Sequence, residues 1–191
     1  MIKHIKRAVL AFRKDESGSI AVETVIIIPA LFWAYLAMFA IFDSYRHHAL
    51  NQKAAFTISD LISRETTPID LDYLVGMQDL LRFLSRTANL DDVSIRVSSL
   101  KYDEAQDIYE REWSQSQGDL TQPLISGSTD DWHDRLPVMP DNEYITVVET
   151  FVRYDAPFKT GLSERTIQNF VFTRPRYAPC VLFDDGSING C

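Results

Sequence analysis

The longest apolar stretch of the chain covers residues 20–42, where Glu23 is the only charged residue. An α-helix rises about 1.5 Å per residue, so this stretch would span roughly 34 Å, enough to cross a bilayer core of about 30 Å. A buried core helix seldom stays apolar on every face for this length. A cleaved secretory signal is shorter and ends in small residues two positions apart, whereas the alanines here lie three apart. We therefore predict a retained transmembrane helix over residues 19–42.

The periodicity of apolar residues predicts two further helical segments and a first strand. Residues 44–64 repeat apolar side chains at a spacing near 3.6, so the membrane helix is expected to continue as a stalk over residues 43–65. Residues 70–84 have an apolar helical face, and Asp70 can cap their N-terminus. Residues 93–98 alternate between apolar and polar side chains, which is the pattern of a half-buried strand.

Three more strands are predicted in the second half of the chain. Residues 107–114 are suited to pair with the first strand, and residues 144–154 and 166–172 are rich in β-branched and aromatic side chains. Residues 118–141 contain many Gly, Ser, Asp and Pro residues and are predicted to be a loop. A long helix, a short helix and about four strands predict an α+β fold with a small antiparallel sheet.

Charge is distributed unevenly along the chain. Residues 1–18 carry five basic and two acidic side chains, whereas residues 43–191 carry fourteen basic and twenty-four acidic ones, a net charge of -10. Lys and Arg are retained on the cytoplasmic side of a membrane, so the C-terminal part is expected to be exported. Its acidity offers no basic surface for nucleic acid. The predicted organisation is a cytoplasmic basic leader, a transmembrane helix, a helical stalk and an exported α+β domain, over residues 1–18, 19–42, 43–65 and 66–191.

Both cysteines, Cys180 and Cys191, lie close to the C-terminus on the side that we expect to be exported. An oxidising compartment favours a disulfide between them, closing a short loop through Asp185, Gly186 and Gly190. Such a link would stabilise the fold by about 2 to 3 kcal/mol. The alternative is two free thiols on a frayed tail. No histidine lies near them, so a metal site is not expected.

A short motif at the start of the apolar stretch carries the most specific chemistry. Gly18 ends the basic leader, Ser19 follows, and Glu23 lies five positions after the glycine. A carboxylate inside a membrane helix costs about 2.5 to 3.5 kcal/mol on insertion scales, so it normally has a partner. Cleavage after Gly18 would create an ammonium group on Ser19, one helical turn before Glu23 and within reach of it or of a neighbouring subunit's glutamate. Alternatively, Glu23 lies close enough to the interface to need no partner.

These residues resemble the processing signature of type IV pilins, in which a prepilin peptidase cuts after the glycine. More narrowly, they resemble the TadE-type pseudopilins of the tight-adherence pilus. The matching residues are Phe12, Arg13, Asp15, Gly18, Ala21, Val22, Glu23 and Pro29. The resemblance extends to residues 59–64 and 174–176. Thr24 departs from it, since an aromatic residue commonly follows the glutamate in this family.

The resemblance implies a minor pseudopilin in a bacterial inner membrane, with its C-terminal domain in the periplasm. Its partners would be a prepilin peptidase and other pilins and pseudopilins, and its helix would act by packing into a bundle. Pro29 removes one helical hydrogen bond, and pilin-like helices bend at such a proline. A tolerated kink is the alternative, because membrane helices accept proline more often than soluble ones.

The sequence carries no enzymatic motif. His133 lies in the exported domain beside Asp130, Asp131 and Asp134, a cluster that could bind a cation weakly, but a solvated acidic loop is the simpler interpretation. G-x-S-x-G, H-E-x-x-H and phosphate-loop patterns are absent. We expect no enzyme, cofactor or small-molecule substrate. The alternative function is an uncleaved, membrane-anchored periplasmic binding or sensor module. Aromatic side chains of the exported part are expected mostly in the core: Tyr102, Tyr109, Trp113, Trp132, Phe151 and Tyr154.

Overall fold

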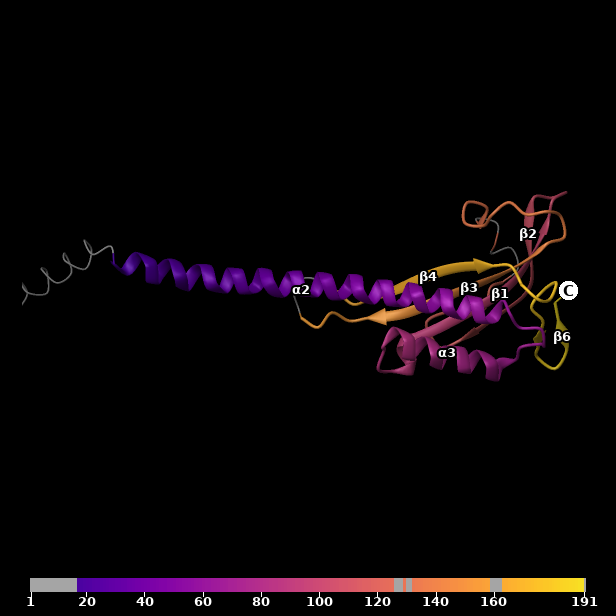
Figure 1. Ribbon diagram of the computed structural model, residues 1–191, viewed down its shortest axis with the longest axis horizontal. Helices are drawn as coiled ribbons and strands as arrows, with labels where there is room; N and C mark the ends of the chain where they lie inside the picture. Colours follow the sequence, from indigo (N-terminus) through magenta and orange to yellow (C-terminus); the bar gives the residue numbers. More distant parts are fainter. Residues whose placement is uncertain (1–16, 126–128, 130–131, 159–162, 191) are drawn as a thin grey trace, which may run out of the picture. The chain divides into compact units, whose positions relative to one another are not determined.

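The computed structural model describes residues 17–125, 129, 132–158 and 163–190. Its first element, α2, is a single α-helix of 46 residues, Ser17–Ile62, that continues past Pro29 (Figure 1). The apolar stretch and the predicted stalk are therefore parts of one helix. A second helix, α3 (Leu71–Ser85), and a short 3-10 turn, η1 (Leu90–Asp92), follow it.

Antiparallel strands make up the rest of the regular structure. Their order in the main sheet is β2-β1-β3-β4, so β1 and β3 form the inner pair (Figure 1). The predicted α+β class is confirmed. A second, two-stranded sheet near the C-terminus was not predicted. The strands are β1 (Val93–Asp103), β2 (Ile108–Gln117), β3 (Tyr144–Tyr154), β4 (Arg165–Thr173), β5 (Phe183–Asp184) and β6 (Ile188–Asn189).

Local sequence explains both ends of α3. The carboxylate of Asp70 accepts a hydrogen bond from the Tyr73 N–H at 2.8 Å, which satisfies one of the free donors of the first turn. Arg86 ends the helix in a left-handed conformation, φ 58°, and its N–H bonds back to the last turn. The capping role that the sequence predicts for Asp70 is confirmed.

The chain forms two compact units that divide at Asp43 and Ser44. The described part of the first unit is α2 up to Asp43 together with residues 156–158. The second unit holds the rest of α2, helix α3 and all the strands.

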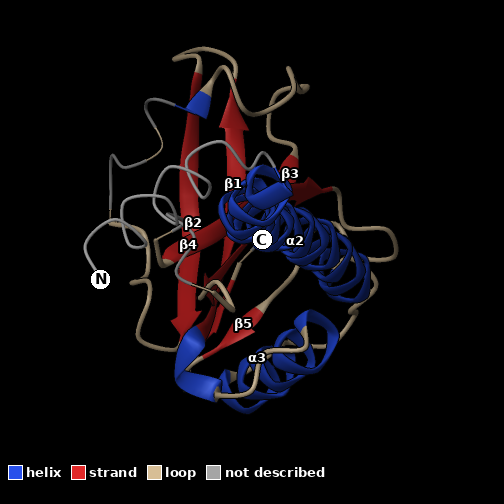
Figure 2. Ribbon diagram, turned by 90° about the vertical axis from the view of Figure 1, so that its left-hand side faces the viewer, coloured by secondary structure: helices blue, strands red, loops and turns tan. Residues whose placement is uncertain are grey.

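The main core of the second unit lies where the last turns of α2 and helix α3 pack on one face of the sheet (Figure 2). Burying each large aliphatic side chain stabilises a fold by about 1.5–3 kcal/mol. This core explains why the apolar positions of the stalk recur at helical spacing. Its buried members are Ala54, Ile58, Ile62, Ile69, Leu74, Leu81, Val93, Ile95, Val97, Trp113, Val148, Val152, Val181 and Phe183.

The prediction that β1 is half-buried is wrong, because its polar positions are covered as well. Ser94 and Ser98 are both fully buried. The Ser94 hydroxyl accepts a hydrogen bond from the Leu120 N–H at 2.9 Å, and the Ser114 hydroxyl accepts one from the Leu124 N–H at 3.0 Å. The segment after β2 thus lies against the serine-lined face of the sheet. The serines satisfy its backbone donors, as buried polar groups require.

Gly118 makes this close approach possible. Its φ is +97°, a backbone conformation that residues other than glycine rarely adopt. A Cβ atom at this position would overlap Ser94 Oγ and lie 2.7 Å from the Val93 carbonyl oxygen. Only glycine therefore lets the chain turn from β2 onto the face of β1.

A second core lies on the same face as the serines. It is formed mainly by the C-terminal end of β1, the N-terminal end of β3 and residues from the segment that was predicted to be a loop. The described residues of this segment have no regular structure beyond turns, but several of their side chains are buried. The irregular segment therefore covers the serine-lined face of the sheet and is part of the folded domain. Its members are Leu100, Tyr102, Tyr109, Leu124, Trp132, Leu136, Met139, Ile145 and Val147.

A buried ion pair joins the two inner strands on this face. Arg96 contacts Glu149 Oε2 through Nε at 2.6 Å and through a terminal nitrogen at 2.5 Å. Glu149 is only 1% exposed, and its other oxygen accepts a hydrogen bond from the Gln168 amide at 3.2 Å. Arg96 also donates to the Gln122 carbonyl at 3.0 Å. The pair thus ties β1, β3, β4 and the covering segment together.

Candidate functional site

The apolar stretch of α2 exposes large side chains on all sides of the helix. Phe32 and Trp33, which are neighbours on the helix, are both 61% exposed, and Ile20 and Val25 are both 72% exposed. Among the described residues, α2 is the one helix that is long and apolar enough to cross a membrane. An apolar surface of this extent needs lipid or other apolar helices around it.

The residues of the predicted processing site lie in the first turns of α2. The helix begins at Ser17, so the backbones of Gly18 and Ser19 are already helical, and Glu23 follows one turn after Ser19. The Thr24 hydroxyl donates a hydrogen bond to the Ile20 carbonyl at 2.7 Å. The residue that departs from the family pattern therefore has its polar group bonded within its own helix. Phe12, Arg13 and Asp15 lie outside the described residues.

Pro29 lies inside α2, twelve residues after its start. Because proline has no N–H, the carbonyl of Val25 lacks its usual helical partner. The helix is nonetheless continuous through this position. Whether it bends there within a filament stays a prediction.

The structure brings together residues 59–64 and residues 174–176, the two distant segments to which the resemblance extends. Arg176 contacts the Asp60 carboxylate at 2.7 Å, and its backbone N–H donates to the Ser63 carbonyl at 2.8 Å. Asp60 also pairs with Arg64 at 3.0 Å, and this hydrogen bond and charge raise the pKa of the Arg64 guanidinium. An ion pair and a backbone hydrogen bond thus join the C-terminal end of α2 to the segment that follows β4.

Cys180 lies in a buried segment of the chain. Its side chain is 1% exposed, and the indole N–H of Trp113 donates to the carbonyl of the next residue, Val181, at 2.8 Å. The alternative of a frayed tail is therefore wrong for this part of the chain. Cys191 lies outside the described residues, so the disulfide stays a prediction. A Cβ atom on Gly190, the residue before Cys191, would lie 3.4 Å from the Cys180 sulfur.

The acidic cluster around His133 is described only in part, since Asp130 and Asp131 lie outside the described residues. His133 Nδ1 lies 3.8 Å from an oxygen of Asp107. Tyr102 donates a hydrogen bond to the same carboxylate at 2.7 Å, which raises the pKa of the Tyr102 phenol to about 12. Within the described part of the chain, no group of three or more His, Cys, Asp or Glu side chains is placed to hold a metal ion.

Five of the six aromatic side chains that were expected mostly in the core are buried there. Phe151 is the exception among these six. It is half-buried, and the guanidinium carbon of Arg96 lies 5.6 Å from the centre of its ring. The buried set is Tyr102, Tyr109, Trp113, Trp132 and Tyr154.

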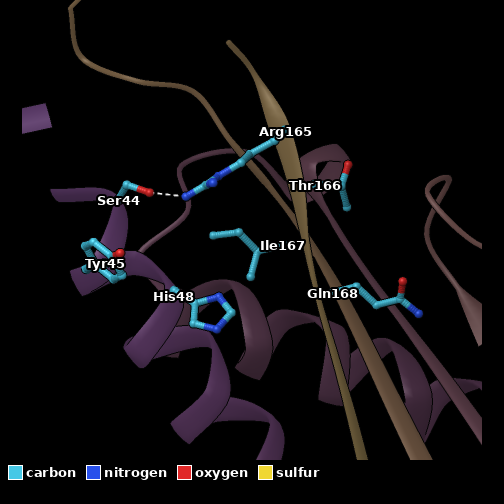
Figure 3. Close-up of a pocket in the computed structure, with 7 residues that line it drawn as sticks. All are labelled: Ser44, Tyr45, His48, Arg165, Thr166, Ile167 and Gln168. Carbon is cyan, nitrogen blue, oxygen red and sulfur yellow. Dashed lines mark hydrogen bonds between the residues drawn. The ribbon is translucent and has the colours of Figure 1, made fainter. Parts of the chain in front are cut away.

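Sequence reasoning missed a pocket of about 350 Å³ between α2 and β4. Figure 3 shows Arg165 and Ile167 pointing from β4 towards the helix, where the Arg165 guanidinium donates a hydrogen bond to the Ser44 hydroxyl. No motif could have indicated this pocket, because Ser44 and Arg165 lie 121 positions apart. Its lining residues are Ser44, Tyr45, His48, Arg165, Thr166, Ile167 and Gln168.

The described residues offer surfaces for packing: a long apolar helix, a sheet that packs against the last turns of this helix, and the pocket beside Ser44. The resemblance to TadE-type pseudopilins rests on the residues given above. No protein-family model, curated protein or solved structure matches the chain.

Proposed function

We propose that this chain is a minor pseudopilin of the TadE type, which takes part in assembling a tight-adherence pilus. One observation carries the proposal: Gly18 and Glu23 lie in the first two turns of a helix whose following residues expose apolar side chains on every face. The same helix continues into an antiparallel domain, so the part that would pack with other pilins and the part that would remain outside share one continuous helix.

The function would depend on packing and on one charge pair. Removal of the leader after Gly18 would leave an ammonium group on Ser19, one turn from the Glu23 carboxylate. Inside lipid an ion pair is strongly favoured over two separate charges, so the pair would fix how far one helix slides along the next. The chain supplies no reacting group in this account, and we propose that it is not an enzyme.

We further propose that the apolar stretch spans a bacterial inner membrane, with the leader in the cytoplasm and the acidic domain in the periplasm. The excess of Lys and Arg in residues 1–18 supports this orientation. The alternative function, an uncleaved membrane-anchored binding or sensor module, is favoured by a single observation, the pocket beside Ser44.

The mature protein is expected to begin at Ser19 when it is purified from cells that contain a prepilin peptidase. Gly18→Ala is expected to abolish or slow leader removal, because a peptidase site shaped around glycine has no room for a side chain beside the scissile bond. Intact-protein mass spectrometry separates the two forms. Gly76→Ala is the matched control, since a Cβ atom on Gly76 meets nothing within 4 Å. Wild-type protein that keeps Met1 in these cells would favour the uncleaved binding module.

Cys180 and Cys191 are expected to be joined in the mature protein, because a periplasmic location is oxidising and Gly190 lies beside the Cys180 sulfur. Thiol labelling of denatured, unreduced protein should modify neither cysteine. The same measurement tests the orientation, since a domain kept in the cytoplasm would have reduced thiols. Two labelled thiols under conditions that preserve other periplasmic disulfides would contradict both the pairing and the export.

A further inference from the structure

We propose that the pocket lined by α2 and β4 binds the phosphate group of a membrane phospholipid. The proposal rests on the membrane span proposed above and on no step of pilus assembly. It concerns residues that belong to one compact unit of the chain, from Ser44 onwards.

The chemistry of the pocket suits a phosphate group. Arg165 presents five N–H donors in a planar fork, the geometry that matches phosphate oxygens, and its hydrogen bond to Ser44 uses only one of them. The ring of Tyr154, whose centre lies 5.9 Å from the guanidinium carbon, gives the arginine a second contact. Tyr45 and His48 are exposed at the same pocket and can add further donors. Ile167 is 5% exposed and supplies an apolar wall.

The guanidinium is not neutralised by an acidic side chain within the described structure. None of the ion pairs found among the described residues includes Arg165. Its neighbour Glu164 pairs instead with Arg153, at 3.1 Å. An arginine held in place by a hydroxyl and a ring, beside a cavity, is a preorganised site for an anion.

The position of the pocket along α2 matches the depth of lipid headgroups. Ser44 and His48 follow Phe42, the last residue of the apolar stretch, by two and six positions, or about 3 to 9 Å along a helix. The headgroup layer extends roughly 5 to 7 Å beyond the hydrocarbon on each side of a bilayer. A phosphate in that layer would lie level with the pocket.

The described start of the connection between β3 and β4 contacts the apolar stretch of α2. Phe158 of this connection packs edge-on against Phe39 of α2, with ring centres 5.8 Å apart. Both rings are partly exposed. Phe158, which precedes Arg165 by seven positions, therefore lies against the last turn of the apolar stretch.

Charge favours a lipid over a free phosphate ion as the occupant. Residues 43–191 carry a net charge of -10, which repels small anions in solution. Lipid headgroups are instead held beside the pocket at a high local concentration, so little additional affinity is needed to fill it. The volume of about 350 Å³ is at the lower end for ligand pockets and admits a headgroup without its chains.

The test uses the full-length chain in a mild detergent. Binding of short-chain phosphatidylglycerol and, separately, of inorganic phosphate is measured by native mass spectrometry. Arg165→Gln is expected to weaken lipid binding about tenfold or more, the factor that follows from losing a hydrogen bond to a charged group. Arg174→Gln is the matched control. It removes the same charge just beyond the other end of β4, where Arg174 pairs with Glu143 at 3.0 Å, and lipid binding should stay within about twofold, since a distant exposed charge is screened.

A second variant keeps the test decisive if Arg165→Gln disturbs the fold. His48→Glu adds a negative charge at an exposed position of the pocket and leaves Arg165 and Ser44 in place. It should weaken lipid binding while the helical content and melting temperature stay at wild-type values.

Equal losses in Arg165→Gln and Arg174→Gln, or no lipid binding by the wild type, would overturn the proposal. Inorganic phosphate that binds as tightly as the lipid, with the same dependence on Arg165, would overturn the lipid assignment and leave a site for free phosphate. A chain that keeps its leader but binds lipid through Arg165 would contradict the pseudopilin function and would support the lipid site.

Discussion

Replacing Arg96 with methionine is expected to lower the free energy of unfolding by about 3–5 kcal/mol, because Glu149 would be left as a buried charge without its partner. Glu149 is 1% exposed, and both close contacts to its Oε2 come from Arg96. The Gln168 amide, 3.2 Å from the other oxygen, is too weak a donor to compensate. The effect is measured by urea unfolding of the full-length chain in detergent. The fluorescence of the buried Trp113 and Trp132 reports the unfolding.

Two further variants separate the buried charge from lost packing. Arg96→Met combined with Glu149→Leu removes both charges and is expected to recover most of the loss, since apolar replacements of buried ion pairs are often neutral or stabilising. Arg174→Met removes an arginine from the exposed pair with Glu143, and the expected cost is below about 1 kcal/mol. A loss for Arg96→Met as small as that for Arg174→Met would show that Glu149 is solvated.

Glu23→Gln is expected to abolish or severely reduce pilus formation while leaving leader removal largely intact. The amide keeps the shape of the side chain but removes the charge that would pair with the new amine on Ser19. A carboxylate without a partner predicts the opposite result, because neutralising it eases membrane insertion and stabilises the protein. Pilus formation in cells and the mass of the purified subunit are the two measurements.

Glu112→Gln is the control for this change. It removes the same charge from an exposed position on β2 and should leave pilus formation unaffected. Normal pili in Glu23→Gln cells, together with a subunit that keeps Met1, would contradict the pseudopilin proposal. The membrane-anchored binding module would then be the better account of the chain.

Elements with strong local signals could be predicted from the sequence. The strand predicted over residues 144–154 matches β3 at both ends, because a run of β-branched and aromatic residues is bounded there by polar turns. Helix α3 was predicted within one residue, because Asp70 offers a cap and the apolar residues recur at 3.6. The order of the strands has no such local signal.

Features that depend on distant contacts could not be predicted. The alternation of Ser94 and Ser98 with valine and isoleucine is the pattern of a one-sided sheet, and it predicts that both serines face water. What covers them is a segment whose composition is typical of a loop, and which is attached through Gly118. Arg96 and Glu149 lie 53 positions apart, so neither indicates the other in the sequence.

If the domain is exported as proposed above, the order of its strands affects how it can form. β1 lies between β2 and β3, but residues 118–143 separate β2 from β3 along the chain. A chain that leaves the membrane behind an N-terminal anchor could close the β1–β2 hairpin within microseconds. The other edge of β1 would stay open until β3 arrives, and open edges pair readily with strands of other molecules. Identical subunits crossing at one assembly site would therefore be vulnerable to strand exchange in that interval, and a periplasmic chaperone that covers β1 would protect them from aggregation.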